Sequence, residues 1–127
     1  MKLLLDTQIF LWAITGDNRL TKPQSSYFMD SNNDLYLSVA SIWEIIVKSS
    51  IGKLPIPTPV MKYVAKQMQE NRIGSLPVRE SHFAELEKLP QLHRDPFDRM
   101  LVAQAVAEQM PILTSDLEIR RYGVVCL

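Results

Sequence analysis

The sequence predicts an α/β fold of three layers, in which helices cover both faces of a central parallel sheet of about five strands. Two observations support this prediction. Short apolar runs that end at a polar residue, such as residues 2–5 and 111–113, are typical of strands buried on both faces of a parallel sheet. Longer segments with apolar residues at helical spacing lie between these runs, and such alternation is characteristic of α/β proteins.

The expected elements alternate along the whole chain. In the first half they are a strand at 2–5, a helix from about 9 to the turn at 16–18, a short helix at about 21–31, a short strand at 35–37 and a helix from Ser38 or Ser41 to about Ser50. A loop follows at 55–59, because each proline in it disfavours helix in the residue before it. In the second half they are a helix at about 59–71, a strand at 73–78, helices at 81–89 and 96–109, and strands at 112–114 and 124–127.

The composition predicts one globular domain, residues 1–127. A hydrophobic fraction of 46% with 22% charged residues argues against disorder. The single cysteine excludes an internal disulfide and fits a reducing compartment, and no apolar run approaches the length of about 20 residues that a membrane span needs. We therefore expect a cytoplasmic protein. Because acidic and basic residues balance at 14 each, nucleic-acid binding would need a local basic patch.

Four acidic residues occupy positions that could bring them into one pocket: Asp6, Glu44, Asp98 and Asp116. Asp6 directly follows an expected strand and Asp116 lies two residues after another, and ligands of open α/β sheets bind at the carboxyl ends of the strands. Two carboxylates about 4 Å apart repel each other by roughly 4 kcal/mol at an effective dielectric constant near 20. Gathering several of them needs a cation, so the pattern indicates a divalent-metal site.

The residues that are missing indicate which metal this site would hold. The chain has one cysteine and two histidines, and it contains no CxxC, HxxxH or HExxH motif of the kind that binds zinc. Carboxylates favour a hard ion that prefers oxygen ligands. We therefore expect Mg²⁺, with Mn²⁺ as the alternative, and both suit phosphodiester chemistry.

Three of these positions also have a purely structural explanation, whereas Asp6 stands at the end of the first strand with no long periodic helix to cap. Ser41 and Glu44 have the spacing of a helix capping box, Asp95 with Pro96 looks like a helix start with Asp98 in its first turn, and Asp116 could cap a short helix. Such caps are commoner than metal ligands. The two tryptophans, Trp12 and Trp43, are expected in the core, and a loop histidine such as His93 is more often incidental than a proton shuttle.

Four segments, in order along the chain, resemble the motifs of PIN-domain ribonucleases, and most of all the VapC-type toxins whose sequences open with LLLDTHxxLW. They are KLLLDTQIFLW (2–12), LSVASIWEIIVKSSIGKL (37–54), HRDPFDRMLVAQA (93–105) and Thr114-Ser115-Asp116 followed by Tyr122-Gly123-Val124. Gln8 is a departure, because that subgroup usually has histidine there.

This resemblance implies a Mg²⁺-dependent endoribonuclease that is the toxin of a type II toxin–antitoxin pair. Asp6 and Asp98 would be direct metal ligands, with Glu44 and Asp116 completing the acidic site. Second-shell or substrate-binding roles are expected for four further residues: Thr7, Thr114, Asp95 and Arg99. A structural ion pair is an equally good explanation for Arg99. Helix capping is an equally good explanation for Asp95.

The resemblance also implies partners besides the RNA substrate. A small antitoxin is expected to lay an apolar helix near residues 9–14 and 42–47 and to reach the acids with an arginine or lysine. A two-fold homodimer is expected as well, with apolar residues outside the core as its motive, namely Phe28, Met29, Ile51, Met61 and Tyr63.

Three other functions are open to a chain with this pattern. A haloacid-dehalogenase-like phosphohydrolase needs a second acid two residues after the first, where Gln8 stands. A receiver-like domain needs a late lysine, and none follows Lys88. A catalytically silent PIN-fold interaction protein is the third, and the presence of all four acids counts against it.

Overall fold

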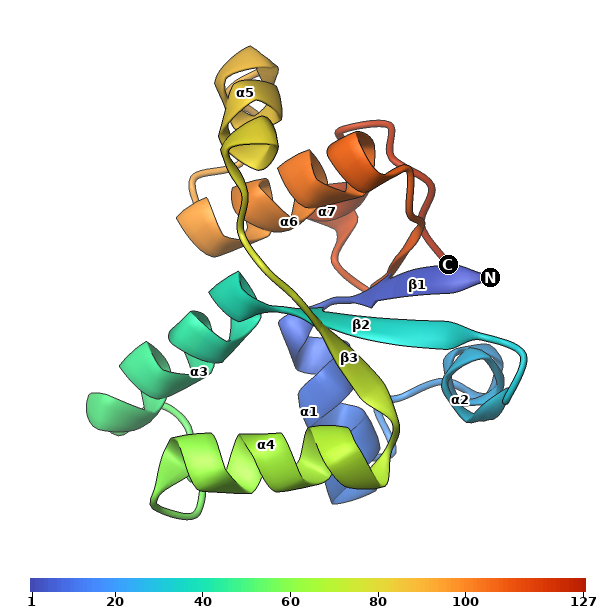
Figure 1. The fold of residues 1–127 in the computed structure, drawn as a ribbon, viewed down its shortest axis with the longest axis vertical. Helices are drawn as coiled ribbons and strands as arrows, with labels where there is room; N and C mark the ends of the chain where they lie inside the picture. Colours follow the sequence, from blue (N-terminus) through green and yellow to red (C-terminus); the bar gives the residue numbers. More distant parts are fainter.

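The computed structural model describes residues 1–127 and has a four-stranded parallel sheet with helices on both faces (Figure 1). The strand order is β3–β2–β1–β4, and the strands are β1 (Lys2–Leu5), β2 (Asp34–Ser38), β3 (Ile73–Leu76) and β4 (Ile112–Leu113). The helices are α1 (Thr7–Thr15), α2 (Lys22–Met29), α3 (Val39–Ser50), α4 (Val60–Glu70), α5 (Glu80–Lys88), α6 (Pro96–Glu108) and α7 (Leu117–Arg120). The predicted three-layer α/β/α fold is confirmed.

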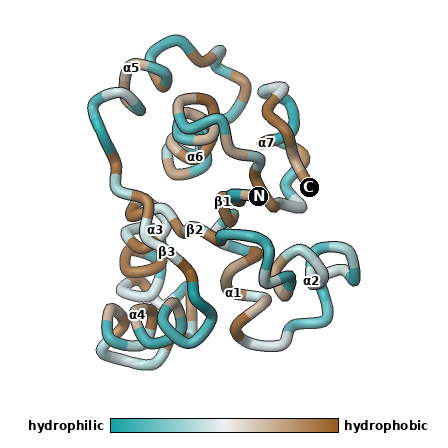
Figure 2. Tube along the Cα trace, turned by 45° about the vertical axis from the view of Figure 1, so that its right-hand side comes forward, coloured by the Kyte–Doolittle hydropathy of each residue, from teal (hydrophilic) through white to brown (hydrophobic).

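Successive side chains along the strands point to opposite faces of the sheet and pack into two separate hydrophobic cores. Leu3 and Leu5 point to the face covered by α1, α3 and α4, whereas Leu4 points to the face covered by α6 and α7. All three leucines are fully buried, as expected for a strand in the middle of a parallel sheet. Along α4, hydrophobic and hydrophilic residues alternate, which is expected for a helix with one buried face (Figure 2).

The prediction of about five strands is corrected to four. The last segment of the chain runs beside β4 but pairs through a single parallel bridge between Cys126 and Ile112. Because β4 is two residues long and the chain then turns away toward Asp116, little backbone is left to pair. β3 likewise ends before the predicted residue 78, since Pro77 has no N–H to continue the ladder.

The helix starts decide which polar residues are free to act elsewhere. The predicted capping box of Ser41 and Glu44 is wrong, because α3 begins earlier, with Ser38 as N-cap accepting a hydrogen bond from the Ala40 N–H. Glu44 therefore lies in the middle of α3, one turn past its start. The predicted caps are confirmed at Asp95, before α6, and at Asp116, before α7.

Two predictions about apolar residues are wrong. Trp43 was expected in the core but is 63% exposed, and its ring packs edge-on against Phe97 at 5.0 Å between centroids. Phe28 was expected outside the core but is buried beneath α2. Both errors arise because the neighbouring elements decide which face of an amphipathic helix is buried.

None of the seven helices combines the length and hydropathy needed to cross a bilayer.

Candidate active site

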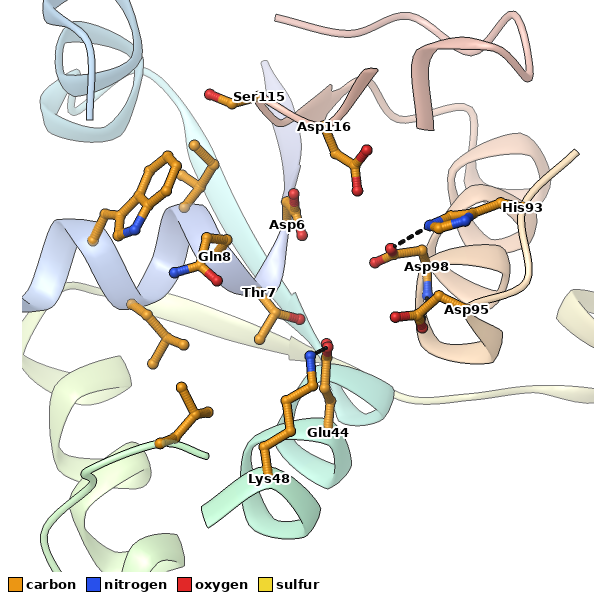
Figure 3. A pocket seen from close by; sticks show the side chains of 14 residues that line it. Asp6, Thr7, Gln8, Glu44, Lys48, His93, Asp95, Asp98, Ser115 and Asp116 are labelled. Carbon is orange, nitrogen blue, oxygen red and sulfur yellow. Dashed lines mark hydrogen bonds and ion pairs between the residues drawn. The ribbon is translucent and has the colours of Figure 1, made fainter. Parts of the chain in front are cut away.

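A cavity of about 460 Å³ opens where β1 and β4 end, between α1, α3 and the start of α6 (Figure 3). Fourteen residues line it: Asp6, Thr7, Gln8, Ile9, Leu11, Trp12, Glu44, Lys48, Leu54, His93, Asp95, Asp98, Ser115 and Asp116. All four predicted acids are therefore on its wall. They come from β1, α3, α6 and the turn after β4, which only the parallel sheet brings together.

Asp6 lies at the base of the cavity and is 6% exposed. Its N–H donates to the Leu113 carbonyl at 3.0 Å, which extends the pairing of β1 with β4 past the last strand residue. Asp6 is the N-cap residue of α1, yet its side chain caps nothing. Its Oδ2 instead accepts a hydrogen bond of 2.7 Å from the Thr114 hydroxyl, so the carboxylate is turned into the cavity and held there.

Glu44 reaches the cavity from the middle of α3 and is 4% exposed. Its Oε2 forms an ion pair with Lys48 Nζ, one helical turn further on. Its Oε1 is buried and has no hydrogen-bond partner. A buried carboxylate oxygen without a partner is costly, so this atom indicates a position suited to a bound cation.

Asp98 and His93 form the opposite wall. Asp98 lies in the first turn of α6, and its Oδ2 is 2.9 Å from His93 Nε2 (Figure 3). Asp116 joins them, because one ligand atom from each of His93, Asp98 and Asp116 falls within 4.8 Å of the other two. Asp95 caps α6 by accepting from the N–H groups of Phe97 and Asp98, at 2.8 and 3.2 Å.

Burial is the main cause of a raised pKa at two of the acids. The pKa of Asp6 rises to about 6 because the side chain is buried, with the Asp116 and Glu44 carboxylates adding to the rise and the hydrogen bond from Thr114 opposing it. Burial also raises the pKa of Asp98 to about 7, with Asp95 and Asp6 adding to the rise and the His93 contact opposing it. Burial accounts for most of each rise in pKa and the neighbouring carboxylates add to it, and raised pKa values of this kind are typical of functional sites.

Of the four secondary residues predicted, three lie at the cavity or support it. Thr114 holds Asp6, Asp95 lines the wall, and the Thr7 hydroxyl donates to Ser41 Oγ at 2.8 Å, which ties α1 to α3. Arg99 does not line the cavity. Its guanidinium donates to the Pro90 carbonyl and the Tyr122 hydroxyl, so it holds the loop before α6 instead of pairing with an acid.

Two residues have a larger part in the cavity than their sequence context indicates. His93 was judged incidental but contacts Asp98, because the loop before α6 folds back over that helix. Lys48 was considered only as one of several cations near an RNA, and its i,i+4 spacing from Glu44 was the signal that could have singled it out. Gln8, where the resemblance leads one to expect histidine, lies exposed on the cavity wall beside Asp6 (Figure 3).

The three-layer α/β/α fold and the carboxylates gathered at its strand ends are the features expected of a PIN-domain protein. They agree with the four sequence motifs that resemble those of PIN domains. The PIN domain family matches residues 3–125, and the chain belongs to that family. Ribonuclease VapC16 from Mycobacterium tuberculosis is 42% identical over 53 residues, and this match spans 42% of the chain and 36% of that protein.

Two solved structures have a similar fold over their whole length. VapBC2 from Rickettsia felis, bound to a DNA fragment from their promoter, has a TM-score of 0.74 at 16% identity, covering 100% of this chain and 98% of that one. VapBC-1 from nontypeable Haemophilus influenzae has a TM-score of 0.69 at 15% identity, covering 100% and 97%. At these identities the likeness concerns the fold alone.

Proposed function

We propose that the protein is a Mg²⁺-dependent endoribonuclease and the toxin of a toxin–antitoxin pair, which hydrolyses RNA phosphodiester bonds with metal-activated water. The observation that carries this proposal is the convergence of Asp6, Glu44, Asp98 and Asp116 on one cavity. Membership of the PIN family and the partial match to a ribonuclease support the same function.

The donor set of the cavity fits a hard divalent cation. Asp6, Asp98, Glu44 and Asp116 would hold it, and they offer only carboxylate oxygens. The partnerless Glu44 Oε1 and the raised pKa values of Asp6 and Asp98 are both relieved by a cation among these side chains. When bound, Mg²⁺ lowers the pKa of water and stabilises charge on the phosphate oxygens.

The chain's own residues orient this site and do not supply a nucleophile. Thr114 fixes Asp6, and the Ser41 hydroxyl, engaged by Thr7, ties α3 to α1. Ser115, the serine on the wall, accepts a hydrogen bond of 2.7 Å from Gln24 Nε2 and is not paired with a general base. A covalent route would need such a pair.

Metal-dependent cleavage by the purified chain tests the proposal. A mixed-sequence RNA should be cut in Mg²⁺ or Mn²⁺, and excess EDTA should stop the reaction. A preparation that binds Mn²⁺ in calorimetry but cuts no RNA would favour the silent interaction protein. One that neither binds metal nor cuts would refute the site itself.

We propose further that a small antitoxin closes the cavity. Besides the acids, the wall has a smaller apolar part made by Ile9, Leu11, Trp12 and Leu54. An amphipathic helix could place its apolar anchors there while one arginine or lysine pairs with Asp6, Asp98 or Asp116 and excludes the metal. Replacing that basic residue by alanine should restore cleavage in the complex, and undiminished inhibition would refute this mechanism.

We also propose a homodimer formed by a second, apolar cavity of about 360 Å³ between α3, α5 and α6. Trp43 and Phe83 line it and are 63% and 54% exposed, and Val39 and Phe97 lie beside them. Side chains of this size on one concave surface are typical of interfaces.

The RNA substrate and the single cysteine make the cytoplasm the expected place of action.

A further inference from the structure

Lys48 is the one lysine or arginine among the fourteen residues that line the acidic cavity. It lies on α3, and its side chain runs alongside Glu44 so that the ammonium ends level with the Glu44 carboxylate, on the side of Gln8 (Figure 3). The side chain is 39% exposed, whereas that of Glu44 is 6% exposed. The ammonium thus faces the cavity, and the carboxylate that holds it is buried.

The hydrogen bonds of Lys48 leave part of its capacity open. An ammonium group has three N–H donors, and the bond to Glu44 Oε2 is the one hydrogen bond that Lys48 Nζ makes. Two donors therefore remain for a ligand.

The charge of the cavity makes such a cation important for an anionic substrate. Five carboxylates line the wall: Asp6, Glu44, Asp95, Asp98 and Asp116. A phosphodiester that approaches them is repelled, and the net charge of the chain, which is zero, adds no attraction. Arg99 and Arg121 are outside the lining of the cavity and are engaged elsewhere, Arg99 by Pro90 and Tyr122, and Arg121 by the Leu92 carbonyl and Glu118.

We propose that Lys48 is a substrate anchor, which donates to a non-bridging oxygen of the RNA phosphodiester while Glu44 fixes its position. The inference rests on the proposed ribonuclease function and adds a residue to it. An ammonium on a flexible stem is well suited to phosphate. Because the buried Glu44 carboxylate already holds the Lys48 ammonium in place, the lysine side chain loses less conformational entropy when it binds a phosphate.

Two other roles would leave the same ion pair in the structure. The pair could merely stabilise α3, as i,i+4 pairs do, or Lys48 could act only by orienting Glu44 toward the metal. The three roles differ in what the loss of Lys48 changes: RNA binding and its salt dependence, stability alone, or metal affinity.

The test compares Lys48→Met, Lys48→Arg and the matched control Lys66→Met. Lys66 forms an i,i+4 pair with Glu70 on the exposed face of α4 and does not line the cavity. RNA affinity is measured by fluorescence anisotropy in Mg²⁺, using a 12-mer with phosphorothioate linkages that resist cleavage, at four salt concentrations. Mn²⁺ affinity of each variant without RNA is measured by calorimetry, and folding by circular dichroism.

The anchor predicts that Lys48→Met weakens RNA binding about 10- to 100-fold, the size of one charged hydrogen bond. The slope of log affinity against log salt should fall in magnitude by about 0.7, the share of one phosphate contact on a single strand. Lys48→Arg should stay within about threefold of wild type, and Lys66→Met should not differ from it.

Three results would overturn the anchor. RNA affinity and salt slope unchanged in Lys48→Met would leave only a helix-stabilising pair. An equal loss of Mn²⁺ and RNA affinity with an unchanged slope would assign Lys48 to Glu44 orientation. Loss of binding in Lys48→Arg as well would exclude charge as the cause. If wild type itself neither cuts nor binds RNA, the proposed function fails instead. Should Lys48→Met not fold, Lys48→Gln takes its place.

Discussion

At the level of single residues, the acids differ in what holds them. Asp6 is held by the Thr114 hydroxyl, Glu44 by the Lys48 ammonium and Asp98 by the His93 imidazole. One oxygen of Asp116 instead caps α7 by accepting from the Glu118 N–H. Each is oriented before any cation arrives. Asp6 and Asp98 have raised pKa values, chiefly because their carboxylates are shielded from solvent.

Asp98→Asn should abolish RNA cleavage while leaving the fold intact, because it removes the charge at constant volume; Asp6→Asn should do the same. We expect a loss of at least about 100-fold, the upper end of what even an outer-shell partner contributes. Gel assays measure cleavage and circular dichroism the fold. The control is Glu87→Gln, which alters an exposed acid on α5. Full activity in either aspartate variant would refute the metal site.

The stability of the metal-free protein should fall as pH rises from about 4 to about 7. In this window the folded state holds protons on Asp6 and Asp98, with pKa values of about 6 and 7, that the unfolded state has released. The unfolded state binds fewer protons, so the free energy of unfolding decreases with pH. Asp17, whose pKa the Arg19 hydrogen bond lowers to about 2, acts only below this window.

Urea unfolding in EDTA at several pH values checks this expectation. The slope should flatten in Asp98→Asn, and added Mg²⁺ should restore stability at pH 7, because a ligand that binds only the folded state stabilises it by mass action. Stability that rises between pH 5 and 7 in EDTA would show that the acids are not held protonated.

At the level of elements, helix ends and helix contacts position the site. α6 begins with a capped turn that places Asp98 at the cavity, and α5 covers α6 on the side away from it. His82, fully buried, joins these two helices. Its Nδ1 accepts from the Arg79 N–H at 3.0 Å, and its Nε2 lies 3.0 Å from Glu108 Oε2.

His82→Leu should lower the free energy of unfolding by about 1–3 kcal/mol, since it strands the Arg79 N–H without its acceptor. Cleavage should persist, because His82 does not line the acidic cavity. Urea unfolding and the RNA assay measure the two effects. Glu108→Gln is the milder control, as its amide oxygen still accepts from the imidazole. An unchanged unfolding midpoint in His82→Leu would contradict this account of how α5 is held.

At the level of the whole molecule, the sheet order places β1 between β2 and β4, so Asp6 stands next to the ends of both neighbours. The acidic cavity and the apolar cavity lie on two sides of α3, with Glu44 lining one and Trp43 the other. One helix therefore contributes both to the proposed chemistry and to the proposed dimer.

Trp43→Asp should convert the proposed dimer to a monomer, because it places a charge in the middle of an apolar interface. Multi-angle light scattering at micromolar concentration measures the mass. The control is Met29→Asp, which changes a side chain that is 75% exposed on α2 and outside the apolar cavity. A monomeric wild type, or a dimer that survives Trp43→Asp and dissociates with Met29→Asp, would refute this interface.

The sequence by itself determined the fold class, the approximate elements and which four acids belong together. Strands buried on both faces are uniformly apolar, and the three leucines at residues 3–5 have this pattern. The order of the motifs gave the family, which in turn implied Glu44 although it lies inside a helix. Capping at Asp95 and Asp116 was also readable, since it depends on neighbours within three residues.

Only the tertiary structure decided what depends on distant parts of the chain. Which side of α3 faces the core set the exposure of Trp43, and the folded loop before α6 set the contact of His93 with Asp98. The hydroxyl of Thr114 meets Asp6 across 108 positions of sequence. The spacing of apolar residues along the sequence shows whether a segment is a helix or a strand. It does not show which face of that element is buried. Packing decides the buried face, because burial is shared between elements that the sequence keeps apart.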